Sequence, residues 1–298
     1  MKVRQIESLM AAVELGSLRK AAQKLDISQP AVTQQINTLE ESLNLILLRR
    51  TPGGVAGTPN YKSLQPYIEG VLRASHALKQ EADAISGSAS GSLTISAVPA
   101  ASQKIIPKAM KLFRSISPQI QFKILEMSSE GVKSTVQTGQ SDIGLLSHWI
   151  HDEPADEQET LTYRTVYENP SPLTLYLPAG TTLSSPNPLP STELTQYEFI
   201  VLTKGHLLRE AFDKLSEDVP LRIVYETTSS AAALTLVQGG LGASILPESM
   251  MADQAQPVIK RPLEIKFPKT GISIIRRNDE MPTSPMIEFT RTIQGMFI

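Results

Sequence analysis

The spacing of the apolar residues changes once along this chain of 298 residues, and that change constrains the fold most. Up to residue 85 the apolar positions recur at intervals of three and four residues, as on one face of a helix. From residue 93 onward, short apolar strands alternate with amphipathic helices, which is the rhythm of an α/β domain. The stretch between them consists of glycine, serine and alanine, the composition of a flexible linker. The sequence therefore predicts a helical N-terminal part, a hinge and an α/β part.

Three short helices are predicted in the first sixty residues. Ile6 and Val13 belong to the apolar stripe of the first helix, which Gly16 ends. Ser17 and Ser28 are expected to be the N-cap residues of the second and third helices. Two short helices with a turn of about three residues between them form a helix-turn-helix.

The third predicted helix has polar side chains on the face opposite its apolar stripe. Glutamine and asparagine amides suit paired hydrogen bonds to adenine, and a helix N-terminus attracts phosphate. A merely solvated helix face is the other interpretation of the same pattern. The candidate DNA-binding residues of this helix and its cap are Ser28, Gln29, Pro30, Thr33, Gln34 and Asn37.

A glycine- and proline-rich turn after Arg49 and Arg50 predicts a small β-wing. Two arginines at the base of such a wing could contact phosphates or a minor groove, so we include them among the DNA-binding candidates. The charge distribution agrees with this assignment. The net charge of the chain is −2, but residues 1–62 hold eight Lys/Arg against five Asp/Glu, an excess of +3, whereas residues 91–298 sum to −4.

At this point the residues resemble a known family. The segments Arg4-Gln5-Ile6, Gly16-Ser17-Leu18, Ala21-Ala22, Ser28-Gln29-Pro30-Ala31-Val32-Thr33 and Leu48-Arg49-Arg50-Thr51 are similar to the N-terminal signature of LysR-type transcriptional regulators. The resemblance implies that Ser28, Gln29, Pro30, Thr33 and Gln34 lie at the major groove of promoter DNA, with Arg50 in the wing. The chain departs from the family at Gly53, where a basic residue is usual, and at 57–61, where the family usually has Leu-Thr-x-x-Gly.

The segment 59–86 predicts a long helix with an a/d seam of apolar residues. Packing within the same chain is one interpretation and helix–helix pairing between chains is the favoured one. The resemblance implies the same, because this helix dimerises in LysR-type regulators. The seam residues assigned to dimerisation are Leu64, Ile68, Val71, Leu78 and Ile85.

The alternating part predicts two α/β lobes built on parallel strands, similar to the periplasmic-binding-protein-like effector domain of the same family. The expected domains are a winged helix-turn-helix over 1–58, a dimerising linker helix over 59–86, a hinge over 87–92 and an effector-binding domain over 93–298. Within the last, lobe I is expected over 93–163 and 270–298, and lobe II over 164–269.

Ligands of such sheets bind beyond the carboxyl ends of the strands, where helix N-termini converge. Hydroxyls and backbone amides there would suit a small effector, with an anion as one candidate. Simple helix capping is the alternative role of the serines. The loop residues assigned to effector binding are Ala100, Ser102, Gln103, Ser147, Thr203, Thr228 and Ser229.

Several kinds of chemistry are not expected. The chain has no cysteine, which excludes disulfides and thiol nucleophiles, and no catalytic or phosphate-binding motif is found. The group from His148 to Glu153, with two histidines and two acids, is interpreted as a surface loop rather than a metal site. No cofactor, no signal peptide and no membrane span are expected, so the chain is predicted to be cytoplasmic and not an enzyme.

The leading hypothesis is a DNA-binding regulator, a homodimer or homotetramer, that responds to a small-molecule effector. The alternative is a cytosolic solute-binding or enzymatic α/β protein whose N-terminal helices only mediate dimerisation. A third possibility is a regulator that binds no effector and uses its lobes for assembly alone.

Overall fold

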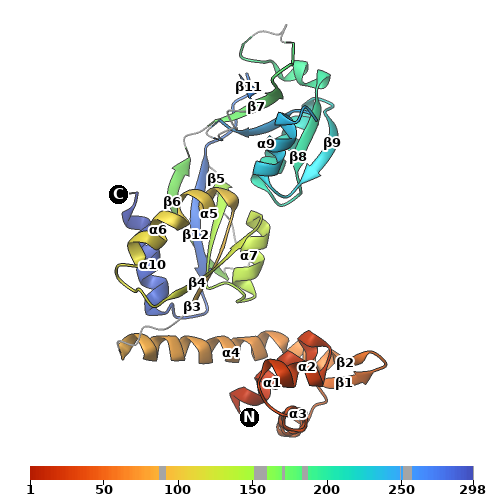
Figure 1. Cartoon of the computed structure of the whole chain (residues 1–298), viewed down its shortest axis with the longest axis vertical. Helices are drawn as coiled ribbons and strands as arrows, with labels where there is room; N and C mark the ends of the chain where they lie inside the picture. The colour runs from red at the N-terminus through yellow and green to blue at the C-terminus, as the bar shows by residue number, and fades with distance from the viewer. Residues whose placement is uncertain are drawn as a thin grey trace. The chain divides into compact units, whose positions relative to one another are not determined.

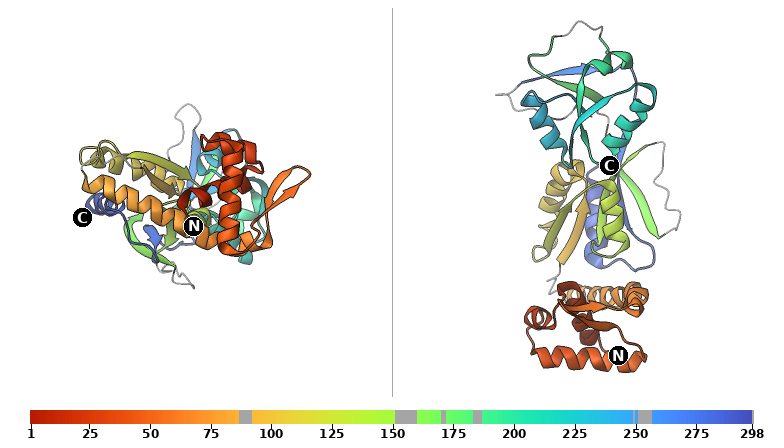
Figure 2. Two further views of the ribbon diagram at one scale, coloured as in Figure 1. Left: turned by 90° about the horizontal axis from the view of Figure 1, so that it is seen from below. Right: turned by 90° about the vertical axis from the view of Figure 1, so that its right-hand side faces the viewer.

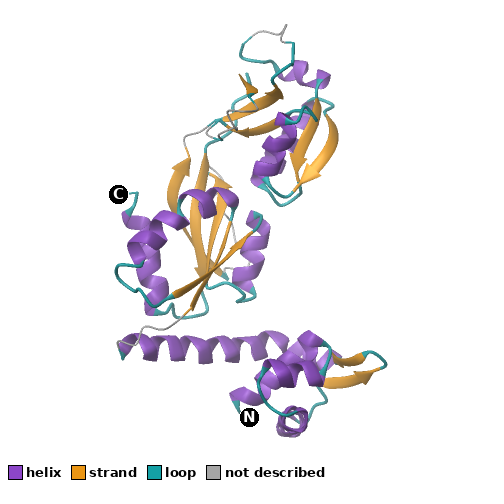
Figure 3. Ribbon diagram, in the orientation of Figure 1, coloured by secondary structure: helices purple, strands orange, loops and turns teal. Residues whose placement is uncertain are grey.

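The computed structural model of the chain describes residues 1–86, 92–150, 160–169, 172–182, 187–248, 250 and 257–297. It divides into two compact units, Met1–Ala89 and Ser90–Ile298. Helices, strands and loops of each unit are distinguished by colour in Figure 3. Most of the expected hinge over 87–92 lies outside the described residues.

The first unit is a winged helix-turn-helix followed by a long helix (Figure 1). Its elements are α1 (Val3–Leu15), α2 (Leu18–Lys24), α3 (Gln29–Leu43), β1 (Leu48–Thr51), β2 (Gly54–Gly57) and α4 (Pro59–Ile85). The stripes predicted from the sequence form one core, in which Leu9, Ile36 and Leu39 are almost completely buried. Because these apolar faces turn inward, the polar face of α3 is left at the surface.

Short local signals set the helix ends in this unit. The Ser17 hydroxyl accepts a hydrogen bond from the backbone N–H of Lys20, and the Ser28 hydroxyl accepts one from Ala31, each at 3.3 Å. Gly16 ends α1 in the left-handed conformation, with φ of 61°. Serine caps and a left-handed glycine satisfy backbone groups that a helix end otherwise leaves unpaired.

The second unit contains two lobes. Lobe I has a five-stranded sheet in the order β4-β3-β5-β12-β6, with α6 and α10 side by side on one face and α7 on the other (Figure 1). Its elements are β3 (Ser92–Ala97), α5 (Pro99–Lys104), α6 (Ile106–Phe113), β4 (Gln121–Glu126), α7 (Ser129–Gln137), β5 (Ile143–Trp149), β6 (Leu161–Asn169), β12 (Thr270–Arg277) and α10 (Ser284–Gly295).

Lobe II is built from the chain between β6 and β12. A sheet in the order β10-β7-β11 and a parallel pair β8-β9 form two buried apolar clusters, one with α8 and the other with α9. Its elements are β7 (Leu173–Pro178), a 3-10 helix η1 (Ser191–Gln196), β8 (Glu198–Leu202), α8 (Leu207–Asp218), β9 (Arg222–Thr227), α9 (Ser230–Gln238), β10 (Ser244–Pro247) and β11 (Val258–Pro262).

The strands that connect the lobes differ from the expectation. The lobe boundary expected after residue 163 falls inside β6, which stays in the sheet of lobe I as far as Asn169. It does so because it pairs antiparallel with β12 along nearly its whole length, and β12 in turn pairs antiparallel with β5. The sheet is therefore parallel over β4-β3-β5 and antiparallel beyond β5.

One aromatic side chain belongs to both lobes. Trp149 is the last residue of β5, in the sheet of lobe I, but its side chain packs against the core of lobe II, which includes Phe199 and Phe212. The backbone N–H of Ile150, the next residue, donates to the carbonyl of Lys269 at 2.9 Å. These contacts join the two lobes where their connecting strands meet.

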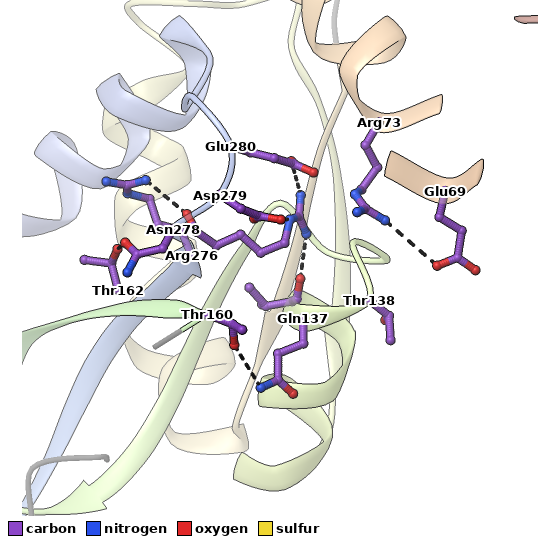
Figure 4. A network of polar contacts seen from close by, with 12 residues as sticks. Glu69, Arg73, Gln137, Thr138, Thr160, Thr162, Arg276, Asn278, Asp279 and Glu280 are labelled. Carbon is purple, nitrogen blue, oxygen red and sulfur yellow. Dashed lines mark hydrogen bonds and ion pairs between the residues drawn. The ribbon is translucent and has the colours of Figure 1, made fainter. Parts of the chain in front are cut away.

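A polar network lies at the end of lobe I that is remote from Trp149 (Figure 4). The buried guanidinium of Arg277, at the end of β12, donates to the carbonyl of Val136 at 2.6 Å and pairs with Glu280. The Arg276 guanidinium donates to the Arg277 carbonyl, and the Thr162 hydroxyl donates to the Asn278 side chain. Positive charge beside the last carbonyls of α7 complements the negative end of that helix.

Candidate nucleic-acid interface and effector pocket

The exposed face of α3 gathers most of the predicted DNA-binding side chains. Gln29, Pro30, Gln34 and Asn37 are exposed on one side of the helix, and Thr33 lies among them. The Thr33 hydroxyl donates to the Gln29 carbonyl at 3.1 Å, so it keeps its acceptor capacity and its methyl group for an outside partner. The Ser28 hydroxyl accepts the capping hydrogen bond from the N–H of Ala31, which leaves its own O–H proton able to donate to an outside acceptor.

The wing brings the two arginines next to that face. Arg49 and Arg50 are exposed on β1 of the hairpin that extends from the helices (Figure 2). A surface cavity of about 100 Å³ is lined by both arginines together with Thr33 and Asn37. Amide and hydroxyl groups that can bind base edges therefore lie beside two cations that can bind phosphates.

Glycine at position 54 fixes the wing against the first helix. Gly54 has φ of +136°, and a Cβ atom there would lie 2.1 Å from the Gly16 carbonyl oxygen. The backbone N–H of the next residue, Val55, donates to that same carbonyl at 3.0 Å. This close approach accepts no side chain, so the position of the hairpin depends on this glycine.

In the structure, the residues of the expected seam on α4 form two groups, one buried within the first unit and one exposed. Ile68 is buried in the core of the first unit and Leu64 packs against that core, so both serve the fold of their own chain. Val71, Leu78 and Ile85 are exposed, the last two by 74% and 80%. The residues left for a partner helix are thus the later ones of the predicted set, joined on the same side by the exposed Tyr67.

The second candidate site is a cavity of about 130 Å³ between the two lobes. Most of its walls are apolar, with hydroxyl, amide, imidazole and ammonium groups among them. Lobe I contributes Val98, Pro99, Ala100, Gln103, Lys104, Ser129, Ser147 and Thr270, and lobe II contributes Leu173, Leu202, His206, Leu207, Leu208, Ser230, Pro247 and Met250.

Three of the predicted effector residues line this cavity, namely Ala100, Gln103 and Ser147. The other four do not line it. The Ser102 hydroxyl is bonded to the Pro99 carbonyl at 3.2 Å and to Glu126, and the Ser229 hydroxyl caps α9 by accepting from Ala232.

Thr203 and Thr228 belong to the same strand ends but lie outside the lining. The backbone N–H of Thr203 is bonded to the Thr227 carbonyl at 3.0 Å, and Thr228 is exposed. The neighbouring Ser230, in the first turn of α9, lines the cavity instead. Strand ends locate the site to within a residue or two, but only the local turn decides which hydroxyl points inward.

His206 lines the cavity as well, although it is not among the seven residues assigned to effector binding. It is the N-cap residue of α8, only 8% exposed, and its imidazole has no hydrogen-bond partner within the part of the chain that the structure describes. Burial lowers the pKa of His206 below its ordinary value, because the protonated form loses its hydration. The uncharged ring presents one donor and one acceptor to the cavity.

Metal and membrane sites are not found in the described chain. Among the described residues no group of three His, Cys, Asp or Glu side chains could hold a metal ion. The expected surface loop from His151 to Glu153, and the acidic run after it, lie outside the described residues. None of the described helices has the length and apolar character that crossing a bilayer requires.

The fold and both sites define a class of protein in which a winged helix-turn-helix precedes a two-lobed ligand-binding domain. Two family descriptions match the chain: "Bacterial regulatory helix-turn-helix protein, lysR family" over residues 3–60 and "LysR substrate binding domain" over residues 86–297. The chain therefore belongs to the LysR family of DNA-binding transcriptional regulators, with an effector-binding domain.

Individual relatives agree with this assignment. The chain is 30% identical to the probable HTH-type transcriptional regulator LrrA of Synechococcus elongatus, over 83% of this chain and 81% of the relative. It shares the fold of full-length CbnR in complex with its target DNA, with a TM-score of 0.65, 18% identity, and 99% of each chain covered.

The effector domain also has solved counterparts. The regulatory domain of Synechocystis CcmR in complex with 2-PG aligns with a TM-score of 0.59 and 19% identity, over 69% of this chain and 97% of that one. The expected family, fold class and regulatory function are confirmed by these matches. The alternative of a solute-binding or enzymatic protein is not supported, since the family consists of transcriptional regulators.

Proposed function

We propose that this regulator reads promoter DNA with α3 in the major groove and holds the flanking phosphates with its wing. The observation that carries the proposal is the cavity shared by Thr33, Asn37, Arg49 and Arg50. Gln29 and Gln34 extend the same exposed face toward the start of α3. Base-edge groups and phosphate-binding cations within one contiguous surface are the two components of specific DNA recognition.

The proposal includes assembly through α4. The exposed Tyr67, Val71, Leu78 and Ile85 are spaced by four, seven and seven residues, which places them on one face of the helix, as in a helix-pairing seam. A two-fold assembly would present two copies of α3 to two half-sites of a promoter. A protein that acts on promoter DNA has to be where the DNA is, so we extend the proposal to a cytoplasmic location and to action by binding, without catalysis.

The cavity between the lobes is the proposed effector site. Its volume of about 130 Å³ limits the ligand to a molecule of about the size of benzene, and its walls favour an apolar body with one or two polar groups. The N-termini of α7 and α9, at Ser129 and Ser230, border the cavity, which makes a carboxylate one candidate for the polar group. CcmR with 2-PG supports the expectation that this fold accepts small ligands.

Two measurements test these proposals. The full chain is titrated against DNA from its own upstream region at two salt concentrations, beside a variant carrying Gln29→Ala and Asn37→Ala. We expect binding that weakens steeply with salt, and a variant that keeps its non-specific affinity but loses preference for the promoter. Absence of any binding, or a variant that discriminates as well as the parent, would contradict the groove assignment.

The effector site is tested by thermal unfolding against a panel of small carboxylates and matched uncharged analogues. A true ligand stabilises the folded chain by about 2.7 kcal/mol when present at a hundred times its Kd. A variant with Ser147→Leu, which fills the cavity, should lose that gain. Equal stabilisation of parent and variant would place the ligand elsewhere.

A further inference from the structure

His206 is a buried polar side chain without a partner of its own. It is the N-cap residue of α8, yet its imidazole forms no capping hydrogen bond, and none of the described residues bonds to it. At the same position of α3 and α9, the side chains of Ser28 and Ser229 do accept a backbone hydrogen bond. Only 8% of His206 is exposed, and it lines the cavity between the lobes. Because burying an unpaired donor and acceptor is costly, the ring is suited to a partner that enters this cavity.

Three helices begin at the same cavity. The first residues of α7, α8 and α9 are Ser129, Leu207 and Ser230, and all three line it. The N-terminus of a helix carries a partial positive charge and backbone N–H groups that can bind an anion. Together with the unpaired imidazole, three such ends at one small cavity favour a negatively charged group in the ligand.

The charged side chains around the cavity agree with a ligand of negative charge. Lys104 of α5 is one of the described lining residues, and none of them is an aspartate or a glutamate. The carboxylate of Glu130, in the first turn of α7, lies outside the lining but beside Gly205, where a Cβ atom would be 2.7 Å from its Oε2. Within the described part of the chain, Glu130 forms no ion pair with His206.

The other charges near α8 are paired or exposed. The guanidinium of Arg209, in the first turn of the helix, pairs with Asp213 at 2.7 Å and also with Glu226. Lys204 is exposed in the loop before the helix. The strands that pack against α8 are β5, β8 and β10, and their lining residues are the uncharged Ser147, Leu202 and Pro247. The charge that can change next to His206 is therefore that of the ligand.

The protonation of His206 is linked to that charge. In the structure, burial lowers the pKa of the imidazole and favours its uncharged form. An anion beside the ring reverses this preference, because an opposite charge at close range favours the protonated form. Binding of an anion in the cavity and uptake of a proton by His206 therefore strengthen one another.

We propose that His206 takes up a proton when the effector binds, and that the effector is a small monocarboxylate held between the resulting imidazolium and the N-termini of α7, α8 and α9. The apolar walls and the volume of about 130 Å³ limit its body to a few carbon atoms. The proposal rests on the proposed effector site, and adds to it the chemical class of the ligand and a dependence on pH. At a fixed effector concentration, a fall in pH raises the occupied fraction of the regulator.

Calorimetric titration of the full chain counts the protons directly. The probes are isobutyrate and isobutyramide, which have nearly the same shape and differ in charge. Each is titrated at about pH 7 in two buffers of different ionisation enthalpy, and the difference in heat gives the number of protons taken up. We expect isobutyrate to take up close to one proton, with an affinity that rises up to about tenfold for each unit by which the pH is lowered. Isobutyramide should bind more weakly and take up no proton.

Two histidine variants locate the proton. His206→Gln keeps an uncharged donor and acceptor, so it should bind isobutyrate without proton uptake and with an affinity that does not change with pH. The matched control is His76→Gln, which removes an exposed histidine of α4 and should behave like the parent. In spectra of 15N-histidine protein, the signal that His206→Gln removes should move to the protonated position when isobutyrate, but not isobutyramide, is added to the parent.

Binding of isobutyrate to the parent without proton uptake would overturn the proposal, and so would uptake that persists in a folded His206→Gln chain. If that variant does not fold, the imidazole signal of the parent decides, and a signal that isobutyrate leaves in place overturns the proposal. Equal binding of the two probes, or no binding of isobutyrate, butyrate and pyruvate, would overturn the carboxylate class. An uncharged molecule that binds the parent but not Ser147→Leu would remove this proposal and leave the effector site in place.

Discussion

The carboxylate of Glu40, on α3, accepts a hydrogen bond from the backbone N–H of Leu48, the first residue of β1, at 2.8 Å. The same oxygen accepts another from the N–H of Leu47 at 2.6 Å. The Glu40 side chain of α3 therefore fixes the position of the first strand of the wing. The positions of Arg49 and Arg50 relative to Thr33 and Asn37 depend on this connection.

We expect Glu40→Ala to destabilise the chain by about 1–3 kcal/mol, because two backbone donors lose a charged acceptor. Urea unfolding measures this effect, and promoter titration should show weaker binding. Glu7→Ala, at an exposed position of α1, is the matched control and should change neither quantity. If Glu40→Ala binds DNA as tightly as the parent, the wing does not take part in binding.

Removing either wing arginine should reduce the salt dependence of DNA binding. Each phosphate contact contributes about 0.9 to the slope of log affinity against log salt, so Arg49→Ala and Arg50→Ala should each lower it by roughly that amount. The control is Arg222→Ala, which removes an exposed guanidinium paired with Glu198 in the effector domain. If the slope of log affinity against log salt is unchanged in both wing variants, residues other than Arg49 and Arg50 bind the phosphates.

Two substitutions on α4 should separate assembly from folding. Leu78→Asp alters a residue that is 74% exposed, so it should leave the unfolding free energy of the single chain nearly unchanged while breaking the oligomer. Ile68→Asp puts a charge into the core of the first unit and should destabilise it by about 3 kcal/mol or more. Light scattering with size-exclusion chromatography reads the first effect and thermal unfolding the second. If the Leu78→Asp variant still forms the oligomer, the interface does not involve this face of α4.

The stability of the chain should fall in mild acid because of His206. Its pKa is lowered in the folded state by burial, so the unfolded chain binds a proton more readily than the folded chain does. Stability is therefore complete above the ordinary histidine pKa of about 6.5 and decreases as the pH falls toward the lowered value. His206→Gln should flatten the curve of unfolding temperature against pH between about 7.5 and 5. A curve with the parent's slope would assign the effect to another group.

Local signals made much of the first unit predictable. Ser17 and Ser28 cap their helices as expected, since capping depends only on the next three residues. The polar face of α3 followed from the positions of Val32 and Ile36 in the core. The wing cavity did not follow from the pattern, because it depends on the contact of Glu40 with Leu47 and Leu48, seven and eight residues later in the chain.

Contacts between distant segments account for most of what the sequence could not predict. β6 stays in lobe I because it pairs with β12, which lies about a hundred residues later in the chain. No local sequence pattern predicts that pairing. The spacing of Ile68 fits a coiled-coil seam, but in the structure this residue is buried in the core of its own unit. Ser229 was assigned to effector binding from its position at a strand end, but it caps α9 instead. His206 lines the cavity, and no local sequence pattern predicts that its side chain points inward.

Trp149 gives the molecule a built-in optical reporter. It is the one tryptophan of the chain, anchored by its backbone to β5 of lobe I while its indole packs against the core of lobe II. Any rotation of one lobe against the other has to change the surroundings of that ring. The emission wavelength of the unlabelled protein will therefore follow closure of the lobes directly, on the native chain and in the presence of DNA.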